Sequence, residues 1–151
     1  MGSPHDFRLS DGTVIDHLPV GTASRALSIL GLPREGPVTI GMNVPSQRHG
    51  HKDIIRVEGL ELRKSETDRL ALLGPNVTVS IVKGGKVSSK LLLEVPERLV
   101  GVIRCGNPTC ITNTERMTPV FDRASADRKD PLVLRCAYCE RAAVEPHVFV
   151  G

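Results

Sequence analysis

The chain has 151 residues, with 20 Lys and Arg against 17 Asp and Glu, so its formal net charge is +3. That length allows one medium domain or two small ones, and the near balance of charge argues against a general nucleic-acid-binding protein, which usually carries a basic stripe. The longest apolar runs are only a few residues long, so no membrane-spanning helix is expected. Since nothing at the N-terminus resembles a secretory signal, we expect a soluble, cytoplasmic protein with reduced thiols.

The first predicted elements are a strand, a helix and a second strand. Residues 13–18 are rich in β-branched side chains and are flanked by Gly and Pro, which favours a strand. Apolar residues then recur at helical spacing over residues 23–30, with Thr22 as a candidate N-cap and Gly31 as a stop. Residues 38–44 alternate as a strand does, up to Pro45.

A turn, a strand and a second helix follow. Residues 46–51 make a polar turn, and residues 53–58 return as a strand. Ser65, with Asp68 three residues later, predicts the start of a helix through a capping box. Three leucines give this helix its apolar side, and Gly74-Pro75 is expected to end it.

The pattern up to Pro96 closes with a hairpin. Residues 77–82 and 87–95 are expected to be its strands, around Gly84-Gly85. The resulting order, β-α-β-β-α-β-β, predicts an α+β, ferredoxin-like domain over residues 1–96, with two helices on one face of a largely antiparallel sheet.

Residues 97–151 have a different texture, and we expect a small all-β domain of the zinc-ribbon or rubredoxin-like kind. No stretch shows helical periodicity beyond one turn, and a domain of this size needs a staple in place of a large core. The expected short strands are residues 100–104, 119–121, 132–135 and 147–150.

The four cysteines of the chain supply a candidate staple. They form two close pairs, Cys105-x4-Cys110 and Cys136-x2-Cys139. Two such loops can aim four thiolates at one tetrahedral zinc ion, and a closed shell leaves no position for substrate, so one structural Zn²⁺ per chain is expected. Two disulfides or four unrelated thiols are the alternatives, and a redox role for the second pair would leave the first unexplained.

No enzyme constellation emerges from the sequence. There is no G-x-S-x-G, P-loop or H-E-x-x-H motif, and the five histidines are scattered. One weaker grouping consists of charged residues on or beside strands of the first sheet: Asp16, His17, Lys52, Arg56 and Lys90. The period of two places Lys52 and Arg56 on one face. Such a set could neutralise a polyphosphate while Asp16 accepts a bond from a ribose hydroxyl, although ordinary solvated charges give the same pattern.

Order and motifs together resemble the regulatory chain of aspartate carbamoyltransferase. The resemblance is carried by the runs at residues 13–19, 40–46 and 52–55, and by the four cysteines with Cys-Ala-Tyr-Cys-Glu at residues 136–140. It spans residues 12 to 150 in unbroken order. It implies an N-terminal nucleotide-binding allosteric domain and a C-terminal zinc domain that contacts the catalytic chain.

The resemblance also implies roles for single residues. Asp16 corresponds to the ribose contact, and His17, Lys52 and Lys90 lie toward the phosphates. Arg56 stands where the family often has a lysine, which keeps the charge but changes the geometry. The other positions implied are Leu9 and Val87 beside the base, Ser80 in place of a polar amide, Gly85 in place of a larger residue near the base, and Asn107 and Glu140 facing the catalytic chain.

The leading hypothesis is therefore a non-catalytic regulatory subunit of aspartate carbamoyltransferase, which controls the first committed step of pyrimidine biosynthesis. CTP, ATP and UTP would be its effectors, and its partners would be the catalytic chain and a second copy of itself, without nucleic acid or membrane. The alternative is a zinc-ribbon nucleic-acid-binding protein, since three arginines lie beside the cysteines. A free-standing nucleotide-binding enzyme is a third reading, but it lacks a candidate nucleophile or base.

Overall fold

The computed structural model describes residues 10–48, 50–124, 127 and 130–143. The chain divides into two compact units between Leu93 and Glu94, three residues before the boundary expected at Pro96. Within the described residues, no helix is both long enough and apolar enough to cross a membrane.

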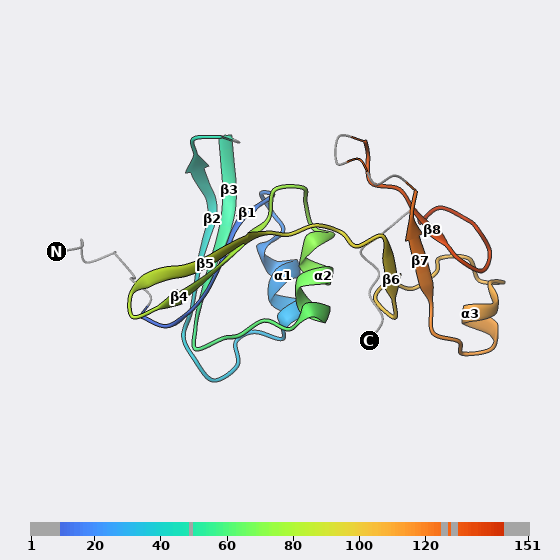
Figure 1. Ribbon diagram of the computed structural model, residues 1–151, viewed down its shortest axis with the longest axis horizontal. Helices are drawn as coiled ribbons and strands as arrows, with labels where there is room; N and C mark the ends of the chain where they lie inside the picture. The colour runs from blue at the N-terminus through green and yellow to red at the C-terminus, as the bar shows by residue number, and fades with distance from the viewer. Residues whose placement is uncertain (1–9, 49, 125–126, 128–129, 144–151) are drawn as a thin grey trace. The chain divides into compact units, whose positions relative to one another are not determined.

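The first unit is a five-stranded antiparallel sheet with two helices on one face (Figure 1). The strand order is β2-β3-β1-β4-β5. β1 therefore lies between β3 and β4, which α2 connects, and β3 lies between β2 and β1, which α1 connects. This arrangement confirms the predicted ferredoxin-like layout with an added hairpin strand. The elements are β1 (Gly12–Leu18), α1 (Ala23–Leu30), β2 (Val38–Ser46), β3 (Gly50–Glu58), α2 (Lys64–Ala71), β4 (Thr78–Lys83) and β5 (Lys86–Leu92).

The core of this unit lies between the helices and one face of the sheet. Ile15 of β1 is directly opposite Ile55 of β3 and Val79 of β4, and all three are buried. They belong with buried residues of the helices, namely Ala26, Leu30, Leu70 and Ala71. Because side chains alternate along a strand, the neighbours of Ile15 point to the opposite, open face of the sheet.

The N-terminus of α1 is capped differently from the prediction. Thr22 occupies the N-cap, but its hydroxyl donates to the carbonyl of Pro19 and makes no cap bond. The carboxylate of Asp53, which is fully buried on β3, instead accepts from the backbone N–H groups of Gly21 (3.0 Å) and Ala23 (3.1 Å). The predicted stop is confirmed, because Gly31 caps the C-terminus in the left-handed conformation, at φ 61°.

The start of α2 also differs from the prediction. The N-cap is Arg63, two residues before Ser65, and Glu66 accepts a bond of 3.1 Å from its backbone N–H. Asp68 instead pairs with Lys64 on the exposed side. The predicted capping box was therefore two residues too late, since the acidic residue that closes the first turn is Glu66.

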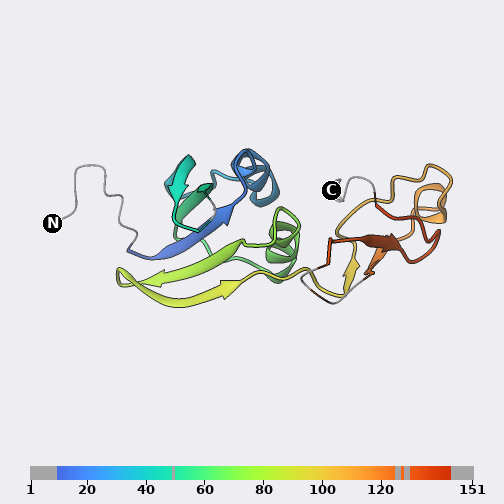
Figure 2. The same ribbon diagram turned by 90° about the horizontal axis from the view of Figure 1, so that it is seen from above.

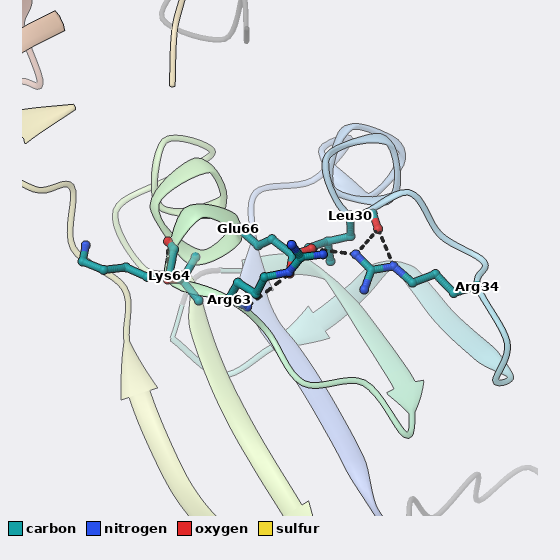
Figure 3. Close-up of polar contacts among 6 residues, drawn as sticks. Leu30, Arg34, Arg63, Lys64 and Glu66 are labelled. Atoms are coloured by element: carbon teal, nitrogen blue, oxygen red, sulfur yellow. Dashed lines mark hydrogen bonds and ion pairs between the residues drawn. The ribbon is translucent and has the colours of Figure 1, made fainter. Parts of the chain in front are cut away.

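The buried carboxylate of Glu66 also joins the two helices (Figure 3). Its Oε2 accepts a bond of 2.7 Å from Nη2 of Arg34. The same guanidinium donates to the carbonyl of Leu30 at the end of α1, from Nε at 3.0 Å and from Nη2 at 2.7 Å. Arg34 thus fixes the C-terminus of α1 to the N-terminus of α2.

The two hairpins of the sheet differ from the prediction in different ways: the first has longer strands next to its turn, and the second ends earlier at its open end. β2 continues through Pro45 to Ser46 and β3 begins at Gly50, so both ends of the predicted turn of residues 46–51 belong to the strands. Gly84 and Gly85 form the tight turn of the β4–β5 hairpin with positive φ, as predicted. This hairpin points away from the two helices (Figures 1 and 2) and ends at Leu92 rather than Val95.

The second unit contains a three-stranded antiparallel sheet in the order β6-β7-β8. Its elements are β6 (Arg98–Val100), α3 (Ile111–Thr114), β7 (Val120–Arg123) and β8 (Leu134–Cys136). The core consists of Leu99, Ile103, Phe121 and Leu134. Of the strand predicted at residues 100–104, only Val100 belongs to β6, and Ile103 forms an isolated bridge. The single-turn helix was not predicted, and residues 147–150 lie outside the described residues.

Candidate metal centre and candidate binding face

The sulfur atoms of the four cysteines form one cluster. They lie within 4.8 Å of one another, with Cys105 and Cys139 at 3.6 Å and Cys110 and Cys136 at 3.7 Å. A disulfide would bring two sulfurs to about 2.05 Å. Four thiolates at about 2.3 Å from a tetrahedral ion would be about 3.8 Å apart. The geometry therefore fits a Cys₄ metal site and does not fit disulfides.

The first cysteine loop is held together by short polar side chains. Asn107 Oδ1 accepts from the backbone N–H of Thr109 at 3.2 Å and from its hydroxyl at 2.9 Å. Asn113 Nδ2 donates to the carbonyls of Cys105 and Asn107 at 2.9 and 2.7 Å. Asn113 belongs to α3, so this single helical turn is bonded to the loop that carries Cys105 and Cys110 and helps to fix the direction of these two side chains.

The second cysteine loop continues β8. The N–H of Cys136 donates to the carbonyl of Arg141 at 3.0 Å, and the N–H of Glu140 donates to the carbonyl of Cys136 at 2.9 Å. Glu140 adopts a left-handed conformation, at φ 63°, which reverses the chain, and its side chain is exposed. This tight turn brings Cys139 back over Cys136.

The environment of the thiols is uneven. Burial raises the pKa of Cys105 to about 12. Burial also pushes the pKa of Cys139 upward, but bonds from the backbone of Arg141 and from the side chain of Asn107 outweigh it and lower this pKa to about 6. Donors aimed at a sulfur stabilise its thiolate, which is the form that a metal ion binds.

The open face of the first sheet carries a row of polar side chains. Lys90 of β5 is opposite Ser80 of β4, Ser80 is opposite Val14 of β1, and Val14 is opposite Arg56 of β3. Directly opposed residues share a face, and the buried neighbours of Val14 face the helices. The structure therefore brings Arg56, Ser80 and Lys90 together, and Val87 lies on the same face, opposite Val82 near the hairpin turn.

A second polar group lies farther along the same face. Lys52 Nζ is 2.9 Å from Asp16 Oδ1, and both side chains are about one-fifth exposed. His17 occupies an irregularity in β1 with φ 58°, and its Nδ1 is 3.2 Å from the hydroxyl of Thr78. Of the eight residues expected to contact a nucleotide, Leu9 lies outside the described residues.

Sequence reasoning missed Val14 and Thr78 on this face. Both follow from strand pairing, which joins Asp16 to Thr78 and Val14 to Ser80. The period of two along each strand was the available signal, but without the register it could not say which residues of different strands meet.

The fold, the cluster of four cysteines and the polar residues of the sheet define a two-domain protein with a candidate metal site in the second domain and a polar, largely basic sheet face in the first. A family described as "Aspartate carbamoyltransferase regulatory chain, allosteric domain" matches residues 7–94, and its "metal binding domain" matches residues 97–148. The chain belongs to the family of aspartate carbamoyltransferase regulatory chains, as the resemblance indicated. The family is that of the regulatory and not of the catalytic chain.

Several archaeal proteins named aspartate carbamoyltransferase regulatory chain are similar over nearly their whole length. That of Thermoplasma volcanium is 46% identical over 145 residues, which cover 94% of this chain and 93% of the relative. That of Pyrococcus horikoshii is 45% identical over 95% of this chain and 94% of the relative. That of Methanocaldococcus jannaschii is 42% identical over 89% of this chain and 88% of the relative.

Proposed function

We propose that this chain binds nucleoside triphosphates on the open face of its first sheet and thereby controls a catalytic chain of aspartate carbamoyltransferase. CTP, ATP and UTP are the proposed effectors, and the controlled reaction is the first committed step of pyrimidine biosynthesis in the cytoplasm. The observation that carries this proposal is the cross-strand row of Arg56, Ser80 and Lys90 with Asp16 and Lys52 beside it. An effector acts through its different affinities for two states of the assembly.

The proposed chemistry of this face divides between its two ends. Lys90 and Arg56 would neutralise phosphate oxygens, with Lys90 as a point charge and Arg56 through its planar fork. Asp16 would accept a bond from a ribose hydroxyl. In the structure Asp16 already pairs with Lys52, so the ribose hydroxyl and the lysine would both bind the carboxylate of Asp16, whose charge the lysine partly offsets. His17 would lie beside the phosphates.

The second domain is proposed to hold one structural Zn²⁺ and to contact the catalytic chain. All four cysteine sulfurs are drawn into the shell, which leaves the ion without a position for substrate. The exposed side chain of Glu140 is available to a partner. Asn107 is half-buried and its side chain accepts two bonds from Thr109, so its proposed role is to shape the loop that meets the catalytic chain.

A dimer of regulatory chains is proposed through the first domain. β2 is an edge strand, and it leaves Ile40 39% and Met42 60% exposed. Unpaired backbone groups beside exposed apolar side chains favour pairing with another strand. Sedimentation at micromolar concentration should give twice 16.4 kDa, and a monomer throughout that range would contradict the dimer.

Calorimetry of CTP and of cytidine with the full chain tests the nucleotide site. Lys90→Ala should weaken CTP binding and leave cytidine unchanged, and the loss should shrink at high salt because salt screens that contact. Lys86→Ala is the matched control, since it removes a lysine of the same strand next to the turn, opposite Lys83 and outside the row. CTP affinity that survives Lys90→Ala would place the phosphates elsewhere.

The variant Asp16→Ala separates the ribose contact from the phosphate contacts. A directional bond to a charged carboxylate contributes about 1.5–3 kcal/mol, so cytidine should lose that much affinity. Because Asp16 also offsets the charge of Lys52, its removal should cost CTP less than it costs cytidine. Equal affinity of the variant and the wild type for cytidine would exclude Asp16 as the ribose contact.

A further inference from the structure

The segment that joins the two domains is held at both ends by hydrogen bonds. On the side of the first domain, the N–H of Leu93 donates to the carbonyl of Val77 at 2.9 Å, and Leu93 is buried. On the side of the second domain, Arg123 Nη1 donates to the carbonyl of Val95 at 3.1 Å. Only Glu94 lies between these two bonded residues, so the two anchoring points are two positions apart in the chain.

Arg123 holds this segment twice. Besides its guanidinium bond to Val95, its backbone N–H donates to the carbonyl of Glu97 at 2.8 Å. The Nε of the same side chain is buried and has no hydrogen-bond partner among the described residues. Among the described residues, the side-chain bond of Arg123 is the one to Val95.

The strand that carries Arg123 also reaches the metal centre. Arg123 is the last residue of β7, a strand of four residues. Near its other end Phe121 is opposite Cys136, and the N–H of Ala137 donates to the carbonyl of Val120 at 2.8 Å. The bond from Arg123 to the linker and the second cysteine loop are therefore attached to the two ends of one short strand, whose Phe121 is buried.

We propose that Arg123 is the positioning residue that couples the two domains: its guanidinium fixes the linker to β7, so that a change in the nucleotide domain is passed on to the cysteine loops. This inference rests on the proposed function. Coupling needs a continuous physical connection between the two sites, and the bond from Arg123 is made to a residue two positions after the anchored Leu93.

The test uses the full chain assembled with its catalytic chain. The measured quantity is the coupling ratio, that is, the larger over the smaller of the half-saturating aspartate concentrations with and without CTP. Arg123→Met keeps the apolar stem but removes the donor to Val95. Its coupling ratio should fall by about 2- to 30-fold, within the limit set by the wild-type ratio. Metal content and the CTP affinity of the isolated full chain should stay within twofold of wild type.

The matched control is Arg98→Met in the adjacent strand. Arg98 is exposed and pairs with Asp122 at 2.8 Å, without a bond to the linker. It should keep the wild-type coupling ratio, which would show that loss of a positive charge at this place is not the cause.

Each outcome bears on a different claim. A coupling ratio that survives Arg123→Met, or that falls equally in Arg98→Met, overturns the coupling role while the nucleotide effect on the wild type stands. A wild-type curve that CTP does not move overturns the proposed function and this inference with it. If Arg123→Met loses metal, Arg123→Leu, which also lacks the donor to Val95, is measured instead: full metal with a reduced ratio supports the role, and full metal with an undiminished ratio overturns it.

Discussion

Removing the carboxylate of Asp53 should selectively destabilise the first domain. Asp53 is fully buried and accepts three backbone N–H groups, from Gly21, from Ala23 and, at 2.9 Å, from Asn43. It therefore caps α1 and also holds the irregularity of β2, where Asn43 has φ 57°. Asp53→Ala leaves all three donors without this partner.

The size of the effect follows from those three bonds. An unsatisfied buried donor costs about 1–3 kcal/mol, and three such costs at one residue do not add fully. Water can reach the part-buried groups at Gly21 and Asn43, so we expect a loss of about 3–5 kcal/mol. That is a large share of the about 5–15 kcal/mol that stabilises a typical domain.

The two domains can be followed separately during urea unfolding. The chain has one tyrosine, Tyr138, and no tryptophan, so tyrosine fluorescence reports the metal domain. Far-ultraviolet circular dichroism reports α1 and α2, which are the longer helices. Asp53→Ala should lower the helical midpoint and leave the fluorescence midpoint in place. Asp68→Ala, which removes a carboxylate from an exposed pair with Lys64, should cost no more than about 0.5 kcal/mol. Equal effects of the two variants would refute the capping role of Asp53.

Three further outcomes are expected. Removal of the metal with a chelator, or the variant Cys136→Ser, should unfold the second domain by tyrosine fluorescence and leave the helical signal, since the free energy of binding in small zinc domains, about 10–16 kcal/mol, is largely folding energy; a metal-free chain with a folded second domain would contradict this. Asn107→Ala removes the acceptor of the Thr109 N–H and hydroxyl in the first cysteine loop and should weaken metal affinity about 10- to 100-fold in competition with a chromophoric chelator; unchanged affinity would show that the loop is fixed without it. Glu66→Gln should cost about 1–3 kcal/mol in the same helical unfolding assay, because its carboxylate receives both Arg34 and the N–H of Arg63; an unchanged midpoint would mean that the helices do not depend on this contact.

Features that depend on neighbouring residues could be predicted from the sequence. Gly31 and the Gly84-Gly85 turn are sites where the backbone needs positive φ, and both were found where expected. The spacing of the cysteines identified the group whose sulfurs the structure brings together. The alternation of strands and helices was enough to give the ferredoxin-like order.

Features that depend on distant contacts could not be predicted. The cap of α1 comes from Asp53, 30 residues away from Ala23, so the local sequence pointed to Thr22 instead. The row from Arg56 to Lys90 depends on the register of four strands, and β1, β2 and β5 each contain an irregularity. The contact of Arg123 with the linker leaves no pattern in the sequence at all.

The central claim is that this chain carries a nucleotide signal to a catalytic partner, and the aspartate saturation curve tests it most directly. The curve is measured for the catalytic chain alone and for its assembly with this chain, each with and without CTP. The account predicts that CTP shifts the half-saturating aspartate concentration of the assembly, by about 5- to 150-fold if the coupling is of typical strength, and leaves the catalytic chain alone unchanged. An assembly that forms with metal bound, binds CTP and keeps the same aspartate curve would contradict it.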